Sequence, residues 1–227
     1  MDKVRLEKKK KKFNFLLSSI DRYGIMRPTK NVKLTTESEP IDMEKWKTIE
    51  KWLHWDLNPW KIKSKSPPTF NTKFFHFLSE NNDNYQEKCK VQGLIGFLDS
   101  IEEDGGFLCV PGFQKVIQEW ADENISKKFP ETSNYVPVPK TDSIQNYTQK
   151  IPIKAGSLII WDSRLPHCNF PNNSDKFRLN QYLKMFQSYK EAPKEYVQDR
   201  TKIIQQNLPK NLTLTELQKK ILGVEKY

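Results

Sequence analysis

The stretch WLHWDLNPW, residues 52–60, places His54 and Asp56 one residue apart. On an extended strand, residues i and i+2 point to the same face, so the imidazole and the carboxylate converge. A catalytic metal needs a third ligand, and the chain has two further histidines, His76 and His167. His167 lies between two strand-like runs. Two histidines and one carboxylate form the facial triad that binds non-haem Fe(II) and leaves coordination positions open. We therefore predict that the fold brings His54, Asp56 and His167 together.

A histidine and an aspartate at this spacing are weak evidence alone, because most such pairs are surface residues or contain a locally hydrogen-bonded histidine. Arg178 strengthens the metal interpretation, since it follows His167 after enough chain for a turn and an antiparallel return strand. A guanidinium offers a planar fork to a carboxylate. A buried arginine beside a metal needs an anionic partner. The distal carboxylate of 2-oxoglutarate would meet that need.

Four segments together resemble one family, the phytanoyl-CoA dioxygenase-like Fe(II)/2-oxoglutarate oxygenases. They are LHWDLNPW, VQGLIGFLDSIEEDGGFLCVPGF, IPIKAGSLIIWDSRLPHCN and FRLNQYLKMF, in the family's order over about residues 20–190. The resemblance implies that His54, Asp56 and His167 are the catalytic iron ligands and that Arg178 anchors 2-oxoglutarate. Each position holds the expected residue type. The N-terminal helical region of the family is expected to be missing or much shortened here.

The expected fold is mostly β, a double-stranded β-helix (a jelly-roll, cupin-like barrel) with flanking α-helices. A chain of 227 residues suits one such domain. We expect a basic disordered tail over residues 1–12, the barrel over 13–190, and a helical C-terminal extension over 191–227 that packs on the barrel. The loop over 61–89, which contains His76, is a candidate lid or substrate-recognition element.

The implied cofactors are Fe(II), 2-oxoglutarate as co-substrate, and dioxygen. Gln92 and Asn180 are further candidates for contacts with the co-substrate. Gln92 could equally face solvent or a ladder edge. Asn180 shares a strand face with Arg178 and Tyr182, and it could instead satisfy hydrogen bonds of the barrel.

Local patterns predict several further features. Apolar spacing indicates helices over 41–53, with Asp42 as N-cap, and over 113–128. The acidic run from Glu102 to Asp104 is expected to be solvated at a turn, with Gly105 and Gly106 at positive φ. A capping box over Thr213–Glu216 and a stop at Gly223 are predicted for the C-terminal helix.

Charge and composition restrict the protein class without choosing a function. The formal charge is +10, yet only Lys8 to Lys12 form a basic block, so nucleic-acid binding is expected only through this tail. The chain has no apolar run of membrane-spanning length and no signal peptide, so we expect a cytoplasmic protein without a membrane contact. The three cysteines, Cys89, Cys109 and Cys168, do not suggest a disulfide scaffold.

The resemblance implies a dioxygenase that hydroxylates a small-molecule or acyl-type substrate and releases succinate and CO2. Asp56 favours hydroxylation, because an alanine or glycine there would open a halide site. Two alternatives remain at this point. One is a catalytically inactive jelly-roll that binds RNA or an acidic partner through its basic surface. The other is a cupin-like metal protein that does not use 2-oxoglutarate. The sequence specifies neither the substrate nor the oligomeric state.

Overall fold

The computed structural model describes residues 16–18, 21–61, 91–127, 130, 135–187 and 194–225. The chain divides into two compact units, one formed by Ser18–Phe186 and the other by Met1–Leu17 with Gln187–Tyr227. The predicted metal ligands all lie in the first of these units. The basic tail over 1–12 and the 61–89 loop beyond Lys61, including His76, lie outside the described residues.

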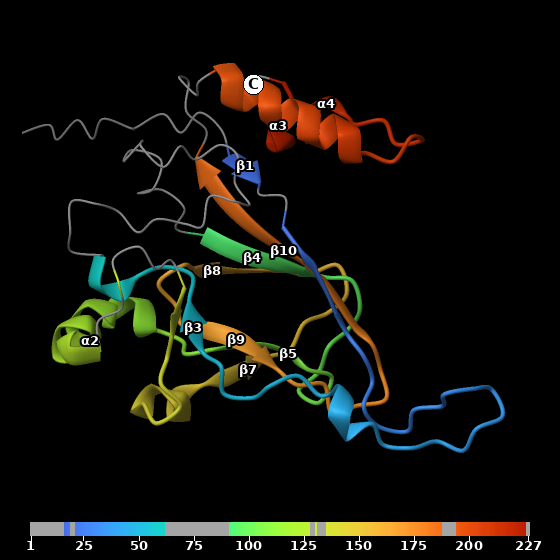
Figure 1. Cartoon of the computed structure of the whole chain (residues 1–227), viewed down its shortest axis with the longest axis vertical. Coiled ribbons are helices and arrows are strands. Elements are labelled where there is room, and N and C mark those ends of the chain that lie inside the picture. The colour runs from blue at the N-terminus through green and yellow to red at the C-terminus, as the bar shows by residue number, and fades with distance from the viewer. Residues whose placement is uncertain are drawn as a thin grey trace, which may run out of the picture. The chain divides into compact units, whose positions relative to one another are not determined.

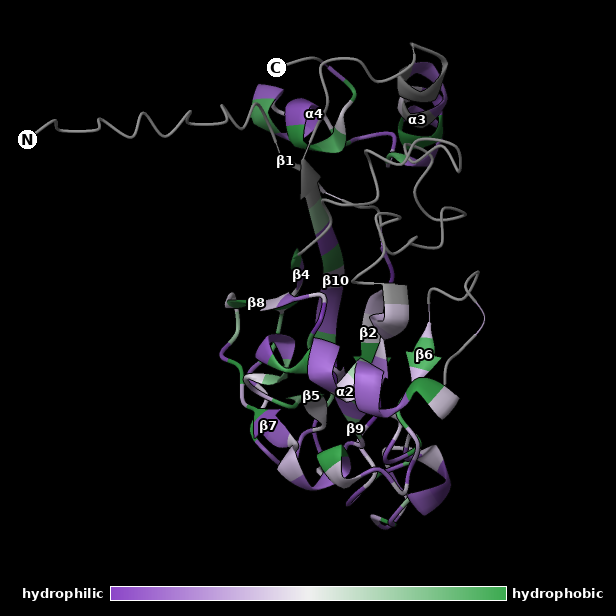
Figure 2. Cartoon of the chain, turned by 90° about the vertical axis from the view of Figure 1, so that its left-hand side faces the viewer, coloured by the Kyte–Doolittle hydropathy of each residue, from purple (hydrophilic) through white to green (hydrophobic). Residues whose placement is uncertain are grey.

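The first antiparallel sheet is organised by the long strand β10, which pairs with both β2 and β4, while β4 pairs in turn with β8. Hydrophilic and hydrophobic residues are mixed along β10 (Figure 2), and its buried residues include the polar Arg178 and Asn180 as well as Leu183. The strand bounds are β2 Tyr23–Met26, β4 Val91–Gly96, β8 Leu158–Asp162 and β10 Arg178–Gln187, and the short β1 covers Leu16–Ser18.

The second sheet has the order β6-β3-β9-β5-β7, and all of its pairings are antiparallel. It lies opposite the first sheet, as Figure 1 shows. Side chains join the two layers: the rings of Phe107 and Trp161 are 4.4 Å apart between centroids. The bounds are β3 His54–Trp55, β5 Gly106–Cys109, β6 Val136–Pro137, β7 Gln149–Ile151 and β9 His167–Phe170.

The predicted mostly-β fold of jelly-roll type is confirmed in its class, but the sheets do not close into a barrel. Among the described residues, backbone ladders run within each sheet and none joins one sheet to the other. Buried apolar side chains such as Trp55, Leu94 and Phe107 fill the space between the layers instead. Packing of side chains, rather than a closed ring of paired strands, therefore holds these two sheets together in the described residues.

The helical segments of Ser18–Phe186 are short. Helix α2 (Ile117–Glu123) buries Ile117, Trp120 and Ala121, and the rings of Trp120 and Trp55 lie 4.7 Å apart. The predicted helix over 113–128 is thus broken into α2 and two flanking turns. The 3-10 turns are η1 Glu44–Trp46, η2 Pro59–Lys61, η4 Phe113–Lys115, η5 Ile125–Lys127 and η6 Ser143–Tyr147.

The prediction of a helix over 41–53 is wrong, because only the 3-10 turn η1 forms in this segment. Its apolar spacing does not mark one buried face, since Ile49 is 71% exposed. Asp42 does not cap a helix. It binds Lys30 at 2.6 Å and accepts a hydrogen bond from the Asn31 amide. Lys51 adopts a left-handed conformation, with φ of 53°, just before β3 begins.

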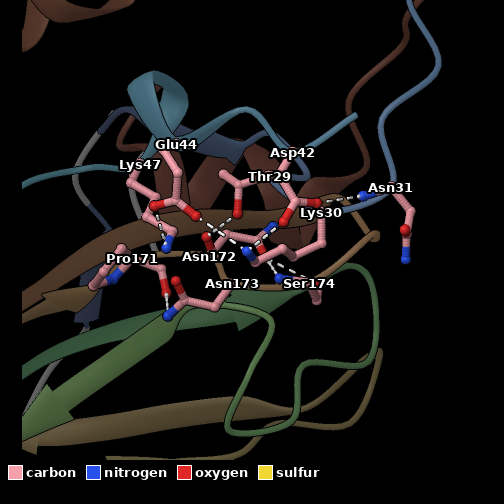
Figure 3. Close-up of polar contacts among 10 residues, drawn as sticks. All are labelled: Thr29, Lys30, Asn31, Asp42, Glu44, Lys47, Pro171, Asn172, Asn173 and Ser174. Atoms are coloured by element: carbon pink, nitrogen blue, oxygen red, sulfur yellow. Dashed lines mark hydrogen bonds and ion pairs between the residues drawn. The ribbon is translucent and has the colours of Figure 1, made fainter. Parts of the chain in front are cut away.

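A network of hydrogen bonds ties the segment around Thr29 to the turn between β9 and β10 (Figure 3). The buried Thr29 hydroxyl donates to the Asn172 carbonyl at 2.7 Å, and the Thr29 amide donates to the Ser174 carbonyl at 2.9 Å. Asn172 in turn donates to the Lys176 carbonyl at 2.6 Å. These bonds fix the turn that leads into Arg178.

The acidic turn after β4 is only partly solvated. Glu102 and Glu103 are exposed, but Asp104 is 2% exposed and accepts a hydrogen bond from the Ile101 amide at 2.9 Å. The expectation that Asp104 is solvated is therefore wrong, because its carboxylate closes the turn internally. Gly105 and Gly106 have positive φ, as predicted.

The C-terminal unit contains the helices α3 (Lys194–Asn207) and α4 (Glu216–Leu222). The capping box lies two residues later than predicted, since Thr215 is the N-cap and Gln218 completes the box. Gly223 ends α4 in the left-handed conformation, as expected. Within the part of the chain that the structure describes, no helix is long and apolar enough to cross a membrane.

Candidate metal centre

His54, Asp56 and His167 converge in the structure as the sequence predicts. His54 begins β3 and His167 begins β9, and the two are direct partners in the strand ladder. The Asp56 oxygens lie 3.7 Å from His54 Nε2 and 3.9 Å from His167 Nε2. One ligand atom from each residue lies within 4.8 Å of the other two. This spacing is slightly more than twice a metal–ligand bond of about 2.1 Å.

Both histidines present Nε2 to the centre because Nδ1 is engaged elsewhere. Nδ1 of His167 lies 2.9 Å from the Leu165 carbonyl, and Nδ1 of His54 lies 3.3 Å from the Trp52 carbonyl. A carbonyl can only accept, so Nδ1 carries the proton and Nε2 keeps its lone pair. Burial lowers the pKa of His54 to about 4 and also lowers the pKa of His167. Both rings are therefore neutral near pH 7, which is the state that binds a metal.

Aromatic rings fix the orientation of His54. The Trp52 ring stacks on the His54 imidazole with ring centroids 5.1 Å apart and an interplanar angle of 12°. The Tyr135 ring also stacks on this imidazole, with centroids 4.7 Å apart. Trp52 is itself held by a hydrogen bond from its indole to the Asn169 carbonyl at 2.8 Å.

Asp56 is held by two donors that bind the same oxygen. Gln92 Nε2 donates to Oδ2 at 2.6 Å, and Lys184 Nζ lies 3.1 Å from that atom. Burial alone would raise the pKa of Asp56, but the Lys184 ammonium, and the two imidazoles when they are protonated, outweigh burial and lower that pKa. Asp56 is therefore an anion at neutral pH.

These groups line a cavity of about 450 Å³ between the two sheets. Two neutral imidazoles and one carboxylate form a donor set that suits first-row divalent metals, Fe(II) among them. The lining combines acidic, basic and aromatic side chains. It consists of Asp21, Arg22, Tyr23, Trp52, His54, Asp56, Gln92, Gly93, Phe107, Tyr135, Trp161, His167, Cys168, Asn169, Tyr182, Leu183 and Lys184.

Arg178 lies behind this lining rather than in it. It is 2% exposed, and its Nη1 donates to Asn169 Oδ1 at 3.1 Å. Its Nη2 is buried and has no hydrogen-bond partner among the described residues. Burial lowers the pKa of Arg178, and Tyr182 opposes that shift. Asn169 therefore connects Arg178 to the cavity, and Arg178 Nη2 has N–H groups left to donate to an anion.

Asn180 is also buried outside the cavity lining. It is paired with Gly24 on β2 and with Gly96 on β4. A Cβ atom at Gly24 would come within 2.8 Å of Asn180 Oδ1, so the glycine leaves room for this side chain. Neither polar atom of the Asn180 amide has a hydrogen-bond partner in the described part of the chain.

Sequence reasoning missed several residues around the centre, above all Lys184, Trp52, Tyr135 and Asn169. Lys184 could have been found, because the alternation that joins Arg178, Asn180 and Tyr182 on one face of the strand continues to position 184. Tyr135 offered no such signal, since it comes from a distant segment of the chain.

The chain is similar to known proteins over the region that contains this candidate site. The phytanoyl-CoA dioxygenase (PhyH) family matches residues 46–180, a range that includes the three candidate ligands and Arg178. A curated relative from Dictyostelium discoideum, named "Putative phytanoyl-CoA dioxygenase", is 29% identical over 179 residues. The match covers 75% of this chain and 47% of the relative, so this chain spans about half of the relative's length.

Solved structures with some likeness include GlcNAc Inducible Gene 2 from Candida albicans, at 16% identity and a TM-score of 0.44, covering 91% of this chain and 52% of that one. A second is the non-heme monooxygenase ThoJ with nickel, at 12% identity and a TM-score of 0.38, with the match covering 76% of this chain and 44% of ThoJ. A third is the epimerase SnoN in complex with Fe3+, alpha ketoglutarate and nogalamycin RO, at 16% identity and a TM-score of 0.33, with the match covering 56% of this chain and 44% of SnoN.

These structural likenesses are distant, and the argument for the family rests on the sequence match over more than half of the chain and on the site within it. The chain belongs to the phytanoyl-CoA dioxygenase family.

Proposed function

We propose that this protein is a non-haem Fe(II)- and 2-oxoglutarate-dependent dioxygenase. The observation that carries the proposal is the convergence of His54, Asp56 and His167 on one point of a cavity. Two imidazoles and a carboxylate on one face of a metal leave positions open for a co-substrate and for dioxygen. When bound, Fe(II) with 2-oxoglutarate and dioxygen would supply an oxidising step that releases succinate and CO2.

Three side chains of this chain would hold the metal. His54 and His167 would bind it through Nε2, because backbone carbonyls fix their Nδ1 atoms. Asp56 would supply the negative charge, since its lowered pKa keeps it ionised. The stacking of Trp52 and Tyr135 beside His54 would limit rotation of that imidazole and shield it from water.

Arg178 would anchor the distal carboxylate of 2-oxoglutarate. Its buried guanidinium has one nitrogen bound to Asn169 and a second, Nη2, without a partner in the described residues. A carboxylate would satisfy that donor and offset the cost of burying the charge. Reaching Arg178 requires Asn169 to share or yield its position, because Arg178 does not line the cavity itself. Asn180 would provide a further donor on the same strand.

We further propose hydroxylation of a small-molecule or acyl-type substrate. Asp56 occupies the position that would have to be vacant for a halide ligand, which favours hydroxylation over halogenation. The cavity of about 450 Å³ has the size of a small-molecule site. Its aromatic walls, with Trp52, Tyr135 and Trp161, suit a substrate that has an apolar portion.

The test is production of succinate from 2-oxoglutarate by protein loaded anaerobically with Fe(II) and then exposed to air. Enzymes of this type are expected to turn over slowly even without the natural substrate. Succinate should exceed that of iron-free protein and should fall to that background in His167→Ala. Equal succinate in all samples would contradict the proposal. Steeply salt-dependent RNA binding in that case would support the binding-protein alternative.

A further inference from the structure

One oxygen of Asp56 is already fully engaged by the protein. Oδ2 accepts a hydrogen bond from Gln92 Nε2 at 2.6 Å and binds Lys184 Nζ at 3.1 Å. A carboxylate oxygen offers about two lone-pair directions. Two donors at these distances therefore occupy Oδ2. Both oxygens lie near the histidines, since Oδ1 is 3.7 Å from His54 Nε2 and Oδ2 is 3.9 Å from His167 Nε2. Only Oδ1 carries neither of these two donors, so it is the oxygen left for a metal.

The two donors are placed by the sheet. Lys184 on β10 and Gln92 on β4 are direct register partners, so both side chains project from the same face toward the cavity. The Gln92 side chain is buried, and the Lys184 side chain is only 17% exposed. Neither donor comes from a loop. The pair is therefore a built feature of the wall behind Asp56.

We propose that Lys184 and Gln92 are positioning residues that make Asp56 a one-oxygen metal ligand. By holding Oδ2, they direct Oδ1 to the metal and prevent the carboxylate from binding through both oxygens. A second bond from Asp56 would occupy a coordination position that the co-substrate or dioxygen requires. This inference rests on the proposed metal site, and it gives Gln92 a different role from the co-substrate contact that the sequence suggested.

A competing explanation predicts different behaviour. In it, the Lys184 ammonium occupies the place of the metal cation beside Asp56, and the metal displaces it on binding. Removing Lys184 would then relieve a competitor and raise metal affinity, while the binding mode of Asp56 would not change.

The experiment uses Mn(II), whose coordinated waters are counted by water-proton relaxation, in the absence of 2-oxoglutarate. Three protein ligands on a six-coordinate ion leave about three positions for water. The Lys184→Met, Gln92→Leu double variant should lose about one of these waters as Asp56 takes a second position, a fall of about one third in the relaxation enhancement. Each single variant should show a smaller fall.

Two further variants serve as controls. Lys184→Arg keeps a cationic donor and should restore the wild-type value. Lys176→Met removes an exposed charge that precedes the same strand and should change nothing.

An unchanged water number in the double variant overturns the proposal, and tighter Mn(II) binding with that result would establish the competing explanation. Loss of Mn(II) binding in the double variant also overturns the proposal, because Lys184 and Gln92 would then be required for metal binding itself and not only for the way in which Asp56 binds. If wild-type protein itself fails to bind Mn(II), the proposed metal site is wrong, and the positioning role of Lys184 and Gln92 is wrong with it. Failure of the metal site is thus distinguished from failure of the positioning role alone.

Discussion

Arg178 is a buried charged side chain whose hydrogen-bonding capacity is only partly used. Its guanidinium is buried, and only part of its donor capacity is satisfied by Asn169 and by the sulfur of Met26. A buried donor without a partner costs roughly 1–3 kcal/mol, and more for a charged group. A residue that serves stability alone would not be expected to retain such a deficit. The proposed 2-oxoglutarate carboxylate would remove this deficit.

The first prediction follows from that deficit. Arg178→Met should weaken 2-oxoglutarate binding to the Mn(II)-loaded protein by about 10- to 100-fold, because charge-assisted bonds contribute about 1.5–3 kcal/mol each. Its affinity for Mn(II) and its thermal midpoint should stay close to those of wild type, since an unsatisfied buried charge is replaced by an apolar side chain. Isothermal titration calorimetry measures both affinities.

The matched control for this prediction is Arg27→Met, which removes an exposed arginine that lies over the Trp46 ring. It should leave 2-oxoglutarate affinity unchanged. If Arg178→Met binds 2-oxoglutarate as well as wild type does, Arg178 is not the anchor.

At the residue scale, the sequence anticipated that His54, Asp56 and His167 lie together, as the structure shows, but it did not anticipate their surroundings. His54 and Asp56 could be paired from their spacing, and the order of motifs added His167 and Arg178. The donors to Asp56 depend on strand register, which aligns Lys184 with Gln92 across two strands far apart in the chain. Asp104 was judged by its acidic neighbours, whereas its burial depends on the conformation of the turn.

At the scale of elements, the turn between β9 and β10 sets the positions of His167, which lines the cavity, and of Arg178, which lies buried behind the lining. This turn is tied to the segment that contains Thr29, and the bonds that tie it are mainly to backbone carbonyls (Figure 3). Lys30 adds ion pairs with Asp42 and Glu44 at 2.6 and 3.1 Å. These pairs are exposed and contribute little to stability, so the buried Thr29 bond is the stronger restraint.

The second prediction tests that restraint. Thr29→Val keeps the shape of the side chain but leaves the buried Asn172 carbonyl without its 2.7 Å donor. The free energy of unfolding should fall by about 1–3 kcal/mol. Urea denaturation followed by tryptophan fluorescence measures this change.

Thr29→Ser retains the hydroxyl and should lose clearly less stability than the valine variant. Equal losses in the two variants would show that the methyl group of Thr29, rather than its hydrogen bond, holds the turn.

The strands β4, β8 and β10 were predicted from the sequence close to the ranges that the structure shows. The β8 strand nevertheless leaves Leu158 and Ile160 exposed. The helix over 41–53 was predicted wrongly, because spacing alone cannot tell that Ile49 is exposed or that Asp42 and Glu44 bind Lys30 instead of capping a helix. Long-range ion pairs of this kind are invisible to a local pattern.

At the scale of the whole Ser18–Phe186 unit, the metal centre lies between two sheets that no backbone ladder in the described residues joins. His54 and His167 come from one sheet, while Gln92 and Lys184, which hold Asp56, come from the other. The contacts of Gln92 and Lys184 with Asp56 therefore link the layers at the candidate metal centre. The sequence predicted this architecture by resemblance, but it could not show whether the barrel closes, because closure depends on strand pairing at the sheet edges.

The third prediction concerns a metal at this centre. Mn(II) at 100 times its dissociation constant should stabilise the folded unit by about 2.7 kcal/mol, since it binds the native state. Differential scanning fluorimetry should show a higher Tm with Mn(II), and the rise should disappear in His167→Ala. A similar rise in that variant would place the stabilising ion somewhere other than the proposed centre.

The most direct test of the central claim is anaerobic titration of Fe(II)-loaded protein with 2-oxoglutarate, followed by its visible charge-transfer absorption. We predict a band in the wild type that saturates with 2-oxoglutarate and is lost or strongly weakened in both His167→Ala and Arg178→Ala. Protein that is folded and loaded with Fe(II) but gives no band would contradict the assignment of His54, Asp56, His167 and Arg178 as the iron and 2-oxoglutarate site.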